Sequence, residues 1–368
     1  MTDTTRVKTD GYAGLVDGLA RRGLLSARWR EVWEKLPRDR FIPHHAWRQD
    51  QERCVPVVRG PDWWDLVHSD QPVVTQVDDG QPDGPGVATS SNSQPSMVAR
   101  MLQLLDVRDG DRVLEIGTAT GYVAALLSER LGSDRVVSVE IDAALSQQAA
   151  DTLADHGLSP RLVVGDGAEG WAEDAPYDRL ISTCALRHIP HALVRQVAPG
   201  GIVVAPLARA FWSGALVRLS VQDGGIARGP FRGGASYMPM RSHRLPDAGP
   251  VDSGTARSSE AVTDPGQLLN LGFALYAGAR LPGVTMSHAE TGTAATVWLQ
   301  DTTGSAAVAA TGESVWEYGE RNLWAEVEAV YAEYAALGQP DGDSFGLTVT
   351  PSGQEVWLRS PRTVIAAA

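Results

Sequence analysis

The stretch VLEIGTATGYVAALLSE, residues 113–129, decides the fold because it joins an apolar strand to an apolar helix through a glycine loop. The segment RVLEIG (112–117) is typical of a buried strand, and residues 122–131 are typical of a helix. Gly117 allows the chain to turn after the strand, and Gly121 allows the helix to begin close beneath a ligand. The loop reads G-x-x-x-G, not G-x-G-x-x-G, but its place between a strand and a helix indicates a nucleotide-type ligand.

The same alternation of strand and helix continues downstream. Strands are predicted at 135–141, 161–166, 178–184 and 201–207, and a helix at 143–156. Strands that alternate with helices predict an α/β fold with a doubly wound, Rossmann-like parallel sheet. After about residue 225 the alternation stops. The tail shows strand patterns at 295–301, 345–350 and 355–360 and a helical pattern at 322–337, which predicts a second, α+β unit.

The N-terminal part has a different texture. Residues 12–36 carry helically spaced apolar residues up to Pro37, and residues 56–86 are rich in proline and turn-forming residues. Pro95 suits the first position of a helix that follows. We therefore expect three segments: a helical and loop segment that forms part of the substrate groove (1–92), a ligand-binding core (93–225) and a C-terminal extension that recognises the substrate (226–368).

Charge and cysteine content limit the class of protein. The net charge of −13 argues against nucleic acid or an anionic membrane as the main partner. No signal-peptide pattern and no membrane-length apolar run occur in the sequence. Cys54 and Cys184, the two cysteines, form no metal-binding motif, and the nearby histidine pairs lack a completing ligand. We expect a soluble cytoplasmic monomer without a metal.

Acidic residues follow the strands of the core. Glu140 ends the second strand, where this topology points a carboxylate at ribose hydroxyls. Asp166 and Gly167 follow the third strand, where a carboxylate can accept from an adenine amino group, and Glu115 lies near the end of the first. Three acids disfavour a pyrophosphate and favour a ligand with a ribose, an adenine and positive charge. S-adenosylmethionine has all three, with S-adenosylhomocysteine as its product; the alternative is a flavodoxin-like sheet without a nucleotide.

Segments VLEIGTATGYVAALLSE, VVSVEID, LVVGDGAEGWAEDAPYDRLIS and PGGIVVAPL strongly resemble the protein-L-isoaspartate O-methyltransferases. LPRDRFIP (36–43) is similar to that family's N-terminal signature, and SSNSQPSMVARMLQLL (90–105) to its T-I-S-x-P-x-M segment. The resemblance runs from about residue 30 to 210. It implies a class I S-adenosylmethionine-dependent methyltransferase that acts on a peptide side-chain carboxylate.

The resemblance also implies roles for individual residues. Ser93 matches the hydroxyl residue beside the methyl donor and the substrate carboxylate, and Ser91 matches the threonine of the same segment. Residues matched to or placed in the cofactor pocket are Glu115, Gly117, Thr118, Gly121, Tyr122, Glu140, Ile141, Asp166, Gly167 and Thr183. Departures from the family pattern are Ala119, where a glycine is usual, and the polar pair Arg187 and His188.

Methylation of a carboxylate needs no general base. A carboxylate is already ionised at neutral pH, so the enzyme must align it and desolvate it without leaving it unpaired. Ser93 is the candidate hydrogen-bond donor, although it could instead cap the helix that follows. Candidate substrate-binding residues are Asn92, Arg187, His188, Arg241 and His243.

The serine-rich segment and a tail of about 130 residues look most like homologues encoded beside ribosomally made macrocyclic peptides, the lanthipeptides and graspetides. Such homologues methylate one aspartate, and the ester closes to a succinimide that leaves aspartimide or isoaspartate. The alternatives are general isoaspartate repair, a non-catalytic protein that binds the cofactor and a peptide, and a methyltransferase for another substrate on the same fold.

Overall fold

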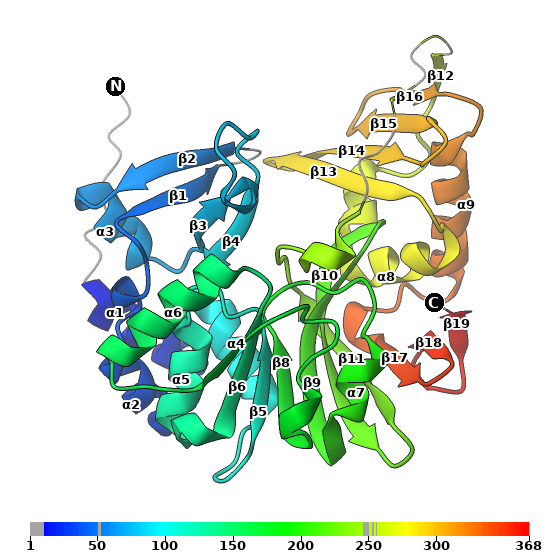
Figure 1. The fold of residues 1–368 in the computed structure, drawn as a ribbon. Helices are drawn as coiled ribbons and strands as arrows, with labels where there is room; N and C mark the ends of the chain where they lie inside the picture. Colours follow the sequence, from blue (N-terminus) through cyan, green and yellow to red (C-terminus); the bar gives the residue numbers. More distant parts are fainter. Residues whose placement is uncertain (1–10, 51–52, 246–249, 252–253, 255, 368) are drawn as a thin grey trace. The chain divides into compact units, whose positions relative to one another are not determined.

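The computed structural model describes residues 11–50, 53–245, 250–251, 254 and 256–367 (Figure 1). The chain forms two compact units: Met1–Cys184 with Arg195–Val204, and Ala185–Val194 with Ala205–Ala368. The described N-terminal residues therefore belong to the same unit as the glycine loop.

The first unit contains the predicted parallel sheet. Its strands are β5 (Val113–Ile116), β6 (Val136–Glu140), β7 (Arg161–Val164), β8 (Tyr177–Ser182) and the first part of β9 (Val197–Arg209). They pair in the order β7-β6-β5-β8-β9, and every pairing is parallel. The order reverses between β5 and β8, which is where a doubly wound sheet binds its ligand. The predicted fold class is confirmed.

Helices flank these strands at the predicted places. They are α4 (Pro95–Leu105), α5 (Tyr122–Leu131) and α6 (Ala143–Asp155), with the short α7 (His191–Arg195) before β9. Residues 12–36 form two helices, α1 (Gly11–Arg21) and α2 (Ala27–Lys35), and not one run. The break has a local cause: Gly23 takes a φ of +72°, and the Ser26 side chain accepts from the amide of Trp29 to begin α2.

A four-stranded antiparallel sheet occupies the region that we expected to be mostly loop. It comprises β1 (His45–Asp50), β2 (Arg53–Val58), β3 (Val73–Val77) and β4 (Ala88–Asn92) in the order β2-β1-β3-β4, with α3 (Pro61–Val67) between β2 and β3. Pro56 was one reason to expect a loop here, but it lies in β2, which is an edge strand, and an edge strand tolerates proline. Trp63 and its apolar neighbours form a buried core beneath this sheet.

The second unit contains two antiparallel sheets. One has the order β10-β11-β17-β18-β19, with β10 (Trp212–Gln222), β11 (Ile226–Gly234), β17 (Phe345–Thr350), β18 (Gly353–Leu358) and β19 (Val364–Ala367). The other has the order β12-β16-β15-β14-β13, with β12 (Arg257–Ser259), β13 (Thr285–Thr291), β14 (Ala294–Gln300), β15 (Ala306–Ala310) and β16 (Val315–Tyr318). The helices are α8 (Leu271–Arg280) and α9 (Leu323–Ala336).

The predicted α+β character of the tail is confirmed. The helix expected at 322–337 is α9, and the strands expected at 295–301, 345–350 and 355–360 are β14, β17 and β18. The glycine-rich and basic stretch after residue 225 carries β11, which we did not predict because glycines weaken the strand pattern. One of those glycines, Gly229, lies against the carbonyl of Arg218, where a Cβ atom would not fit.

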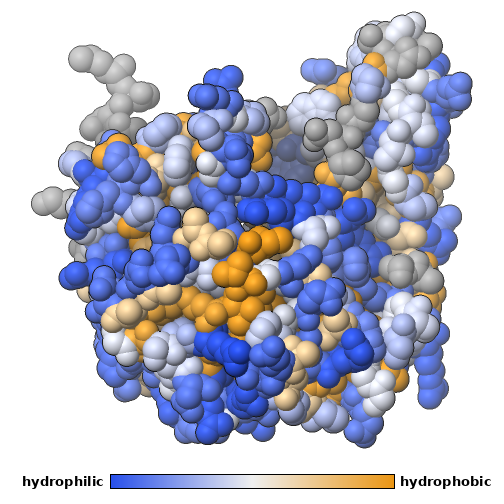
Figure 2. All heavy atoms as spheres, viewed as in Figure 1, coloured by the Kyte–Doolittle hydropathy of each residue, from blue (hydrophilic) through white to orange (hydrophobic). Residues whose placement is uncertain are grey.

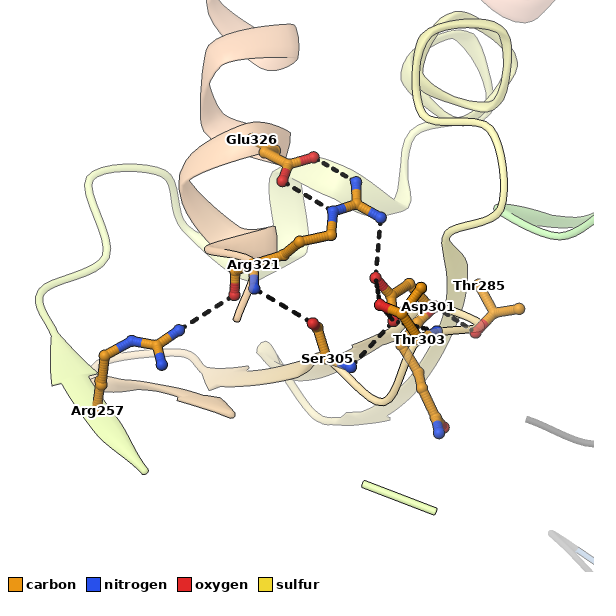
Figure 3. Close-up of polar contacts among 8 residues, drawn as sticks. Arg257, Thr285, Asp301, Thr303, Ser305, Arg321 and Glu326 are labelled. Carbon is orange, nitrogen blue, oxygen red and sulfur yellow. Dashed lines mark hydrogen bonds and ion pairs between the residues drawn. The ribbon is translucent and has the colours of Figure 1, made fainter. Parts of the chain in front are cut away.

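A buried acid joins β14, β15 and α9 (Figure 3). Asp301 is 3% exposed and accepts from the amides of Thr303 and Ser305 at 2.8 and 2.9 Å, and from Arg321 at 3.0 Å. Arg321 also pairs with Glu326 at the start of α9. The buried carboxylate is thus hydrogen-bonded on both oxygens, as a buried charge requires.

Figure 2 shows that hydrophilic residues cover most of the viewed face. Among the described residues, no helix has the length and apolar character needed to cross a membrane. Within the same described ranges, no three His, Cys, Asp or Glu side chains come together as possible metal ligands.

Candidate active site

The candidate cofactor residues lie along one edge of the parallel sheet. Parallel strands end on the same side, and the register places Ile116 beside both Val139 and Ser182, and Glu140 beside Val164. The loops that follow β5, β6, β7 and β8 therefore start at neighbouring points. This edge holds Glu115, Gly117, Glu140, Asp166 and Thr183.

Gly117 and Gly121 both have a positive φ and both lie where a Cβ atom would crowd a neighbour. Gly117 has a φ of +96°, and a Cβ atom there would lie 2.8 Å from the hydroxyl oxygen of Thr183. That hydroxyl donates to the carbonyl of Gly117 at 2.6 Å, so Thr183 fixes the turn. Gly121 begins α5 with a φ of +78°, and a Cβ atom there would press on Ala149. Ala119 lies between them with a φ of +47°.

Glu140 is held in place by the backbone around it. Its side chain belongs to a residue that is 8% exposed, and it accepts from the amide of Ala119 at 2.9 Å and from the amide of Asp142 at 3.1 Å. A carboxylate has about four acceptor positions, so two remain for a ligand. Fixed at the end of β6, the group fits the binding of ribose hydroxyls.

The setting of Glu115 is the observation that bears most directly on the charge of the ligand. The side chain is fully buried; its Oε2 accepts from Ser138, which also contacts Thr118 at 2.6 Å. Its Oε1 is buried and has no partner among the described residues. Burial raises the pKa of the Glu115 carboxyl to about 8, with a further contribution from the charge of Glu140. A cationic ligand beside Oε1 would pair this atom and restore the carboxylate, as the ammonium and sulfonium groups of S-adenosylmethionine require.

The other candidates on this edge occupy varied settings. Asp166 is half-buried after β7 and accepts from the amide of Ala168 at 2.9 Å, and Gly167 beside it is buried. Ile141 is 37% exposed, so its side chain is available for a flat apolar group. The side chain of Tyr122 points elsewhere: it is buried against Trp33 and Phe41.

The serine-rich segment enters α4 without using Ser93 as a cap. The amide of Ser96 in the first turn donates to Asp70 at 2.8 Å, and the residue at the cap position, Gln94, makes no capping bond. Ser93 is half-buried between β4 and α4, and Ser91 is half-buried opposite Val74. Asp70, and not Ser93, therefore caps α4. The hydroxyl of Ser93 is not used as a helix cap.

Sequence reasoning missed Arg38 and Asp70, which hold this segment from behind, and named Asn92 only as a candidate substrate-binding residue. Asn92 is 2% exposed; its side chain accepts from Arg38 and donates to Thr120 of the glycine loop at 3.0 Å. Arg38 lies in LPRDRFIP, and Asp70 in a stretch that we expected to be loop. Both contacts span tens of residues, and a single sequence carries no local signal for them.

The remaining substrate-binding candidates lie in the second unit. The amide of Arg187 donates to Nδ1 of His243 at 3.2 Å, and the rings of His188 and His243 lie 4.5 Å apart. Burial, with the charges of Arg187 and Arg209, lowers the pKa of His188. Arg241 belongs to the same short helical turn as His243, η5 (Arg241–His243). The structure thus brings Arg187, His188 and His243 together, and Arg241 lies two residues from His243 in the chain.

A parallel sheet with its order reversed at the first strand, a glycine loop after that strand and an acid at the end of the next define a class I S-adenosylmethionine-dependent methyltransferase. The family model described as Protein-L-isoaspartate(D-aspartate) O-methyltransferase (PCMT) matches residues 70–243. A solved structure named protein-L-isoaspartate O-methyltransferase shares the fold, with a TM-score of 0.55 and 19% identity over 95% of this chain and 100% of that one.

Relatives in sequence agree. The protein-L-isoaspartate O-methyltransferase of Methanoculleus marisnigri is 34% identical over 60% of this chain and 86% of its own length. That of Methanopyrus kandleri is 32% identical over 65% of this chain and 95% of its own length. A third, protein-L-isoaspartate O-methyltransferase 2 of an Anaeromyxobacter species, is 35% identical over 51% of this chain and 65% of its own length.

The chain belongs to the protein-L-isoaspartate O-methyltransferase family. It is accordingly an S-adenosylmethionine-dependent carboxyl methyltransferase. The cofactor supplies an electrophilic methyl group when bound. Glu115, with its unpaired buried oxygen, and Glu140, with its fixed carboxylate, fit the cationic and ribose parts of that cofactor.

Proposed function

We propose that the chain methylates the side-chain carboxylate of an aspartate in a ribosomally made macrocyclic peptide, acting in the cytoplasm as a monomer. In the next step the backbone nitrogen after the aspartate attacks the ester carbonyl, and the nitrogen's proton leaves with the methoxy group as methanol. The succinimide that forms remains as an aspartimide or takes up water to give isoaspartate. Graspetides and lanthipeptides are the two classes of macrocycle to be tested.

The setting of Ser93 supports the methylation step. Its hydroxyl makes no hydrogen bond to any of the described residues, and the residue is half-buried at the end of β4. A hydroxyl can donate to an incoming carboxylate and partly desolvate it, without the tight ion pair that would blunt the nucleophile. The carboxylate arrives ionised, so the site needs no general base.

One sheet face of the second unit carries the substrate proposal. Trp298, Val308 and Trp316 lie side by side on β14, β15 and β16, and the two indoles are 43% and 47% exposed. Side chains on the same face of the five strands are uncharged: Ser258, Thr285, Ser287, Ala289, Thr291, Ala294, Thr296, Gln300, Ala306, Ala310 and Tyr318. The opposite face packs on α9.

An uncharged face stands out on a protein in which 21% of residues are charged. Exposed tryptophans on an otherwise uncharged face suit a compact, weakly charged peptide that presents apolar groups and backbone together. We propose that this face recognises the macrocycle. Arg187, His188, Arg241 and His243 are proposed to contact acidic groups of the same peptide.

The test compares a macrocyclic peptide with its linear form, each incubated with the enzyme and S-adenosylmethionine. The candidate peptide and cyclising enzyme are to be sought among the genes beside this one, and they would supply both forms. Mass spectrometry is expected to show gain of one CH₂ and then loss of one water relative to the starting macrocycle. Equal methylation of the linear peptide would overturn the macrocycle proposal.

Substitutions on the uncharged face test whether that face binds the macrocycle. The double change Trp298→Ala and Trp316→Ala is expected to raise KM for the macrocycle at least tenfold and to leave cofactor binding unchanged. Val364→Ala, at a position that is 43% exposed on β19, is the matched control and is expected to change neither. An unchanged KM in the double variant would remove the uncharged face from the proposal.

A specific observation favours general isoaspartate repair as a second candidate. The solved protein-L-isoaspartate O-methyltransferase aligns over 95% of this chain, so a fold of this length also occurs in a protein with that name. Repair predicts methylation of many unrelated isoaspartyl peptides. A panel of such peptides, with aspartyl forms as controls, distinguishes the two functions. Peptide binding without any turnover would favour a non-catalytic protein.

A further inference from the structure

Arg38, in η1 (Arg38–Arg40), is a fully buried guanidinium that makes seven hydrogen bonds to six acceptor atoms. Its Nε and Nη2 donate to the side-chain oxygen of Asn92 at 3.0 and 2.9 Å. Nη2 also reaches the carbonyls of Asn92 and Ser93 at 3.2 and 3.3 Å. The contacts of Nη1 are the carbonyls of Val67, Ser69 and Gln71 at 3.1–3.2 Å.

All of these acceptors are neutral. Among the described residues, no carboxylate forms an ion pair with Arg38; nearby Asp70 is bound to Arg22 and to the amide of Ser96. Buried charges are normally paired, because transfer of an ion out of water is costly. Burial lowers the pKa of Arg38 to about 10, so the group keeps its proton at neutral pH. A full positive charge therefore lies behind the Asn92–Ser93 segment.

The segment is oriented by that charge. Carbonyls of Asn92 and Ser93 point at the guanidinium, and in a trans peptide the N–H group points the opposite way. The amides of Ser93 and Gln94 consequently face away from Arg38, and neither donates a hydrogen bond within the described part of the chain. The dipoles of two neighbouring peptide groups are thus aligned by one cation, and the Ser93 hydroxyl belongs to the same segment.

We propose that Arg38 is a positioning residue that prepares this segment for an anionic substrate: it fixes the donors and supplies the positive potential that selects a carboxylate. The proposal rests on the proposed place of Ser93 beside the substrate carboxylate. Asn92 links the arrangement to the cofactor loop through Thr120. The field acts on the bound carboxylate more than on the transition state, because the negative charge is lost as the ester forms.

The variant Asn92→Asp distinguishes the effect of the positive charge of Arg38 from the contribution of Arg38 to stability. It places a carboxylate against the guanidinium, which neutralises the cation and keeps Arg38 anchored. We expect an unchanged or raised Tm, a KM for the peptide substrate at least tenfold higher and a kcat within about threefold of the wild type. Gln148→Asp, on the exposed face of α6, is the control with the same change in net charge.

A binding measurement makes the test independent of turnover. The probes are a short isoaspartyl peptide and its carboxamide counterpart, each titrated in the presence of S-adenosylhomocysteine. Wild type and Gln148→Asp are expected to prefer the carboxylate, and folded Asn92→Asp is expected to lose that preference at least tenfold. A preference retained in Asn92→Asp overturns the proposal. Failure of the wild type to methylate any peptide counts against the proposed function instead.

Arg38 itself provides the second pair of variants. Arg38→Lys keeps the charge and loses most of the hydrogen bonds, so it is expected to lower the Tm and retain the carboxylate preference. Arg38→Met removes the charge and is expected to lose the preference. If Asn92→Asp does not fold, equal preference in the lysine and methionine variants overturns the proposal.

Discussion

Glu115→Gln tests the electrostatics of the cofactor edge. The pKa of the Glu115 carboxyl rises from 4.5 to about 8 because the group is buried. In the absence of cofactor the folded chain therefore holds a proton at neutral pH that the unfolded chain releases. A raised carboxyl pKa gives stability that is complete below pH 4.5 and is lost as the pH rises toward 8.

The magnitude follows from that interval. Each pKa unit corresponds to about 1.4 kcal/mol, so the interval from 4.5 to 8 lowers the free energy of unfolding by about 5 kcal/mol. Between pH 6 and pH 8 the loss is about 2 kcal/mol. Glutamine does not ionise, and its oxygen can still accept from Ser138. The variant is expected to avoid this loss.

The assay is urea unfolding of the cofactor-free protein at pH 6, 7 and 8. The free energy of unfolding of Glu115→Gln, relative to wild type, is expected to rise by about 2 kcal/mol over that range. Glu169→Gln, at an exposed position, is the control and is expected to run parallel to wild type. Parallel curves for wild type and Glu115→Gln would refute the raised pKa.

Binding of the cofactor is expected to remove the proton that Glu115 holds in the cofactor-free protein. A cation beside Oε1 restores the carboxylate, so the wild type is expected to release a proton on binding S-adenosylmethionine at pH 7. Calorimetry in two buffers of different ionisation enthalpy measures that proton. Glu115→Gln is expected to bind at least tenfold more weakly and to release none. Proton release by the variant equal to that of wild type would assign the proton to another group.

Three further changes test other parts of the molecule. Ser93→Ala is expected to lower kcat about 10- to 100-fold with the cofactor Kd unchanged, measured by methyl-ester formation and calorimetry; unchanged turnover would remove Ser93 from the site. Gly117→Ala is expected to destabilise by about 2–4 kcal/mol in urea unfolding, against about 1–2 kcal/mol for Gly157→Ala, where φ is also positive but nothing lies near; equal effects would contradict the crowding at Gly117. Asp301→Ala is expected to cost about 3 kcal/mol and the half-exposed Glu326→Ala at most about 1 kcal/mol, and the reverse order in thermal unfolding would contradict the buried network.

The parallel sheet could be predicted from the sequence because its signals are local. Strands such as β5 and β6 are buried on both faces and read as short apolar runs, and the loops between them carry glycine or acid at fixed places. The resemblance then extended this prediction to the residues of the cofactor edge. Glu115 and Glu140 lie where the pattern placed them.

The support behind the site could not be predicted. Arg38 meets Asn92 across 54 residues, and Asp70 caps α4 across 26 residues, so neither contact leaves a mark in any short window. The strands β1 to β4 carry mixed polar and apolar side chains, and their pairing depends on neighbours that the sequence does not bring together. Tertiary contacts decided these elements.

The alanine at position 119 changes what a loss of Glu140 would mean. A non-glycine residue with a φ of +47° is held in an uphill conformation, and the Glu140 carboxylate supplies the bond to its amide. The same carboxylate thus serves as the ligand's acceptor and as the clamp of the loop that surrounds the ligand. Recognition and architecture are carried by one side chain here, so a change of this acid is expected to disturb the loop as well as the binding of the ligand.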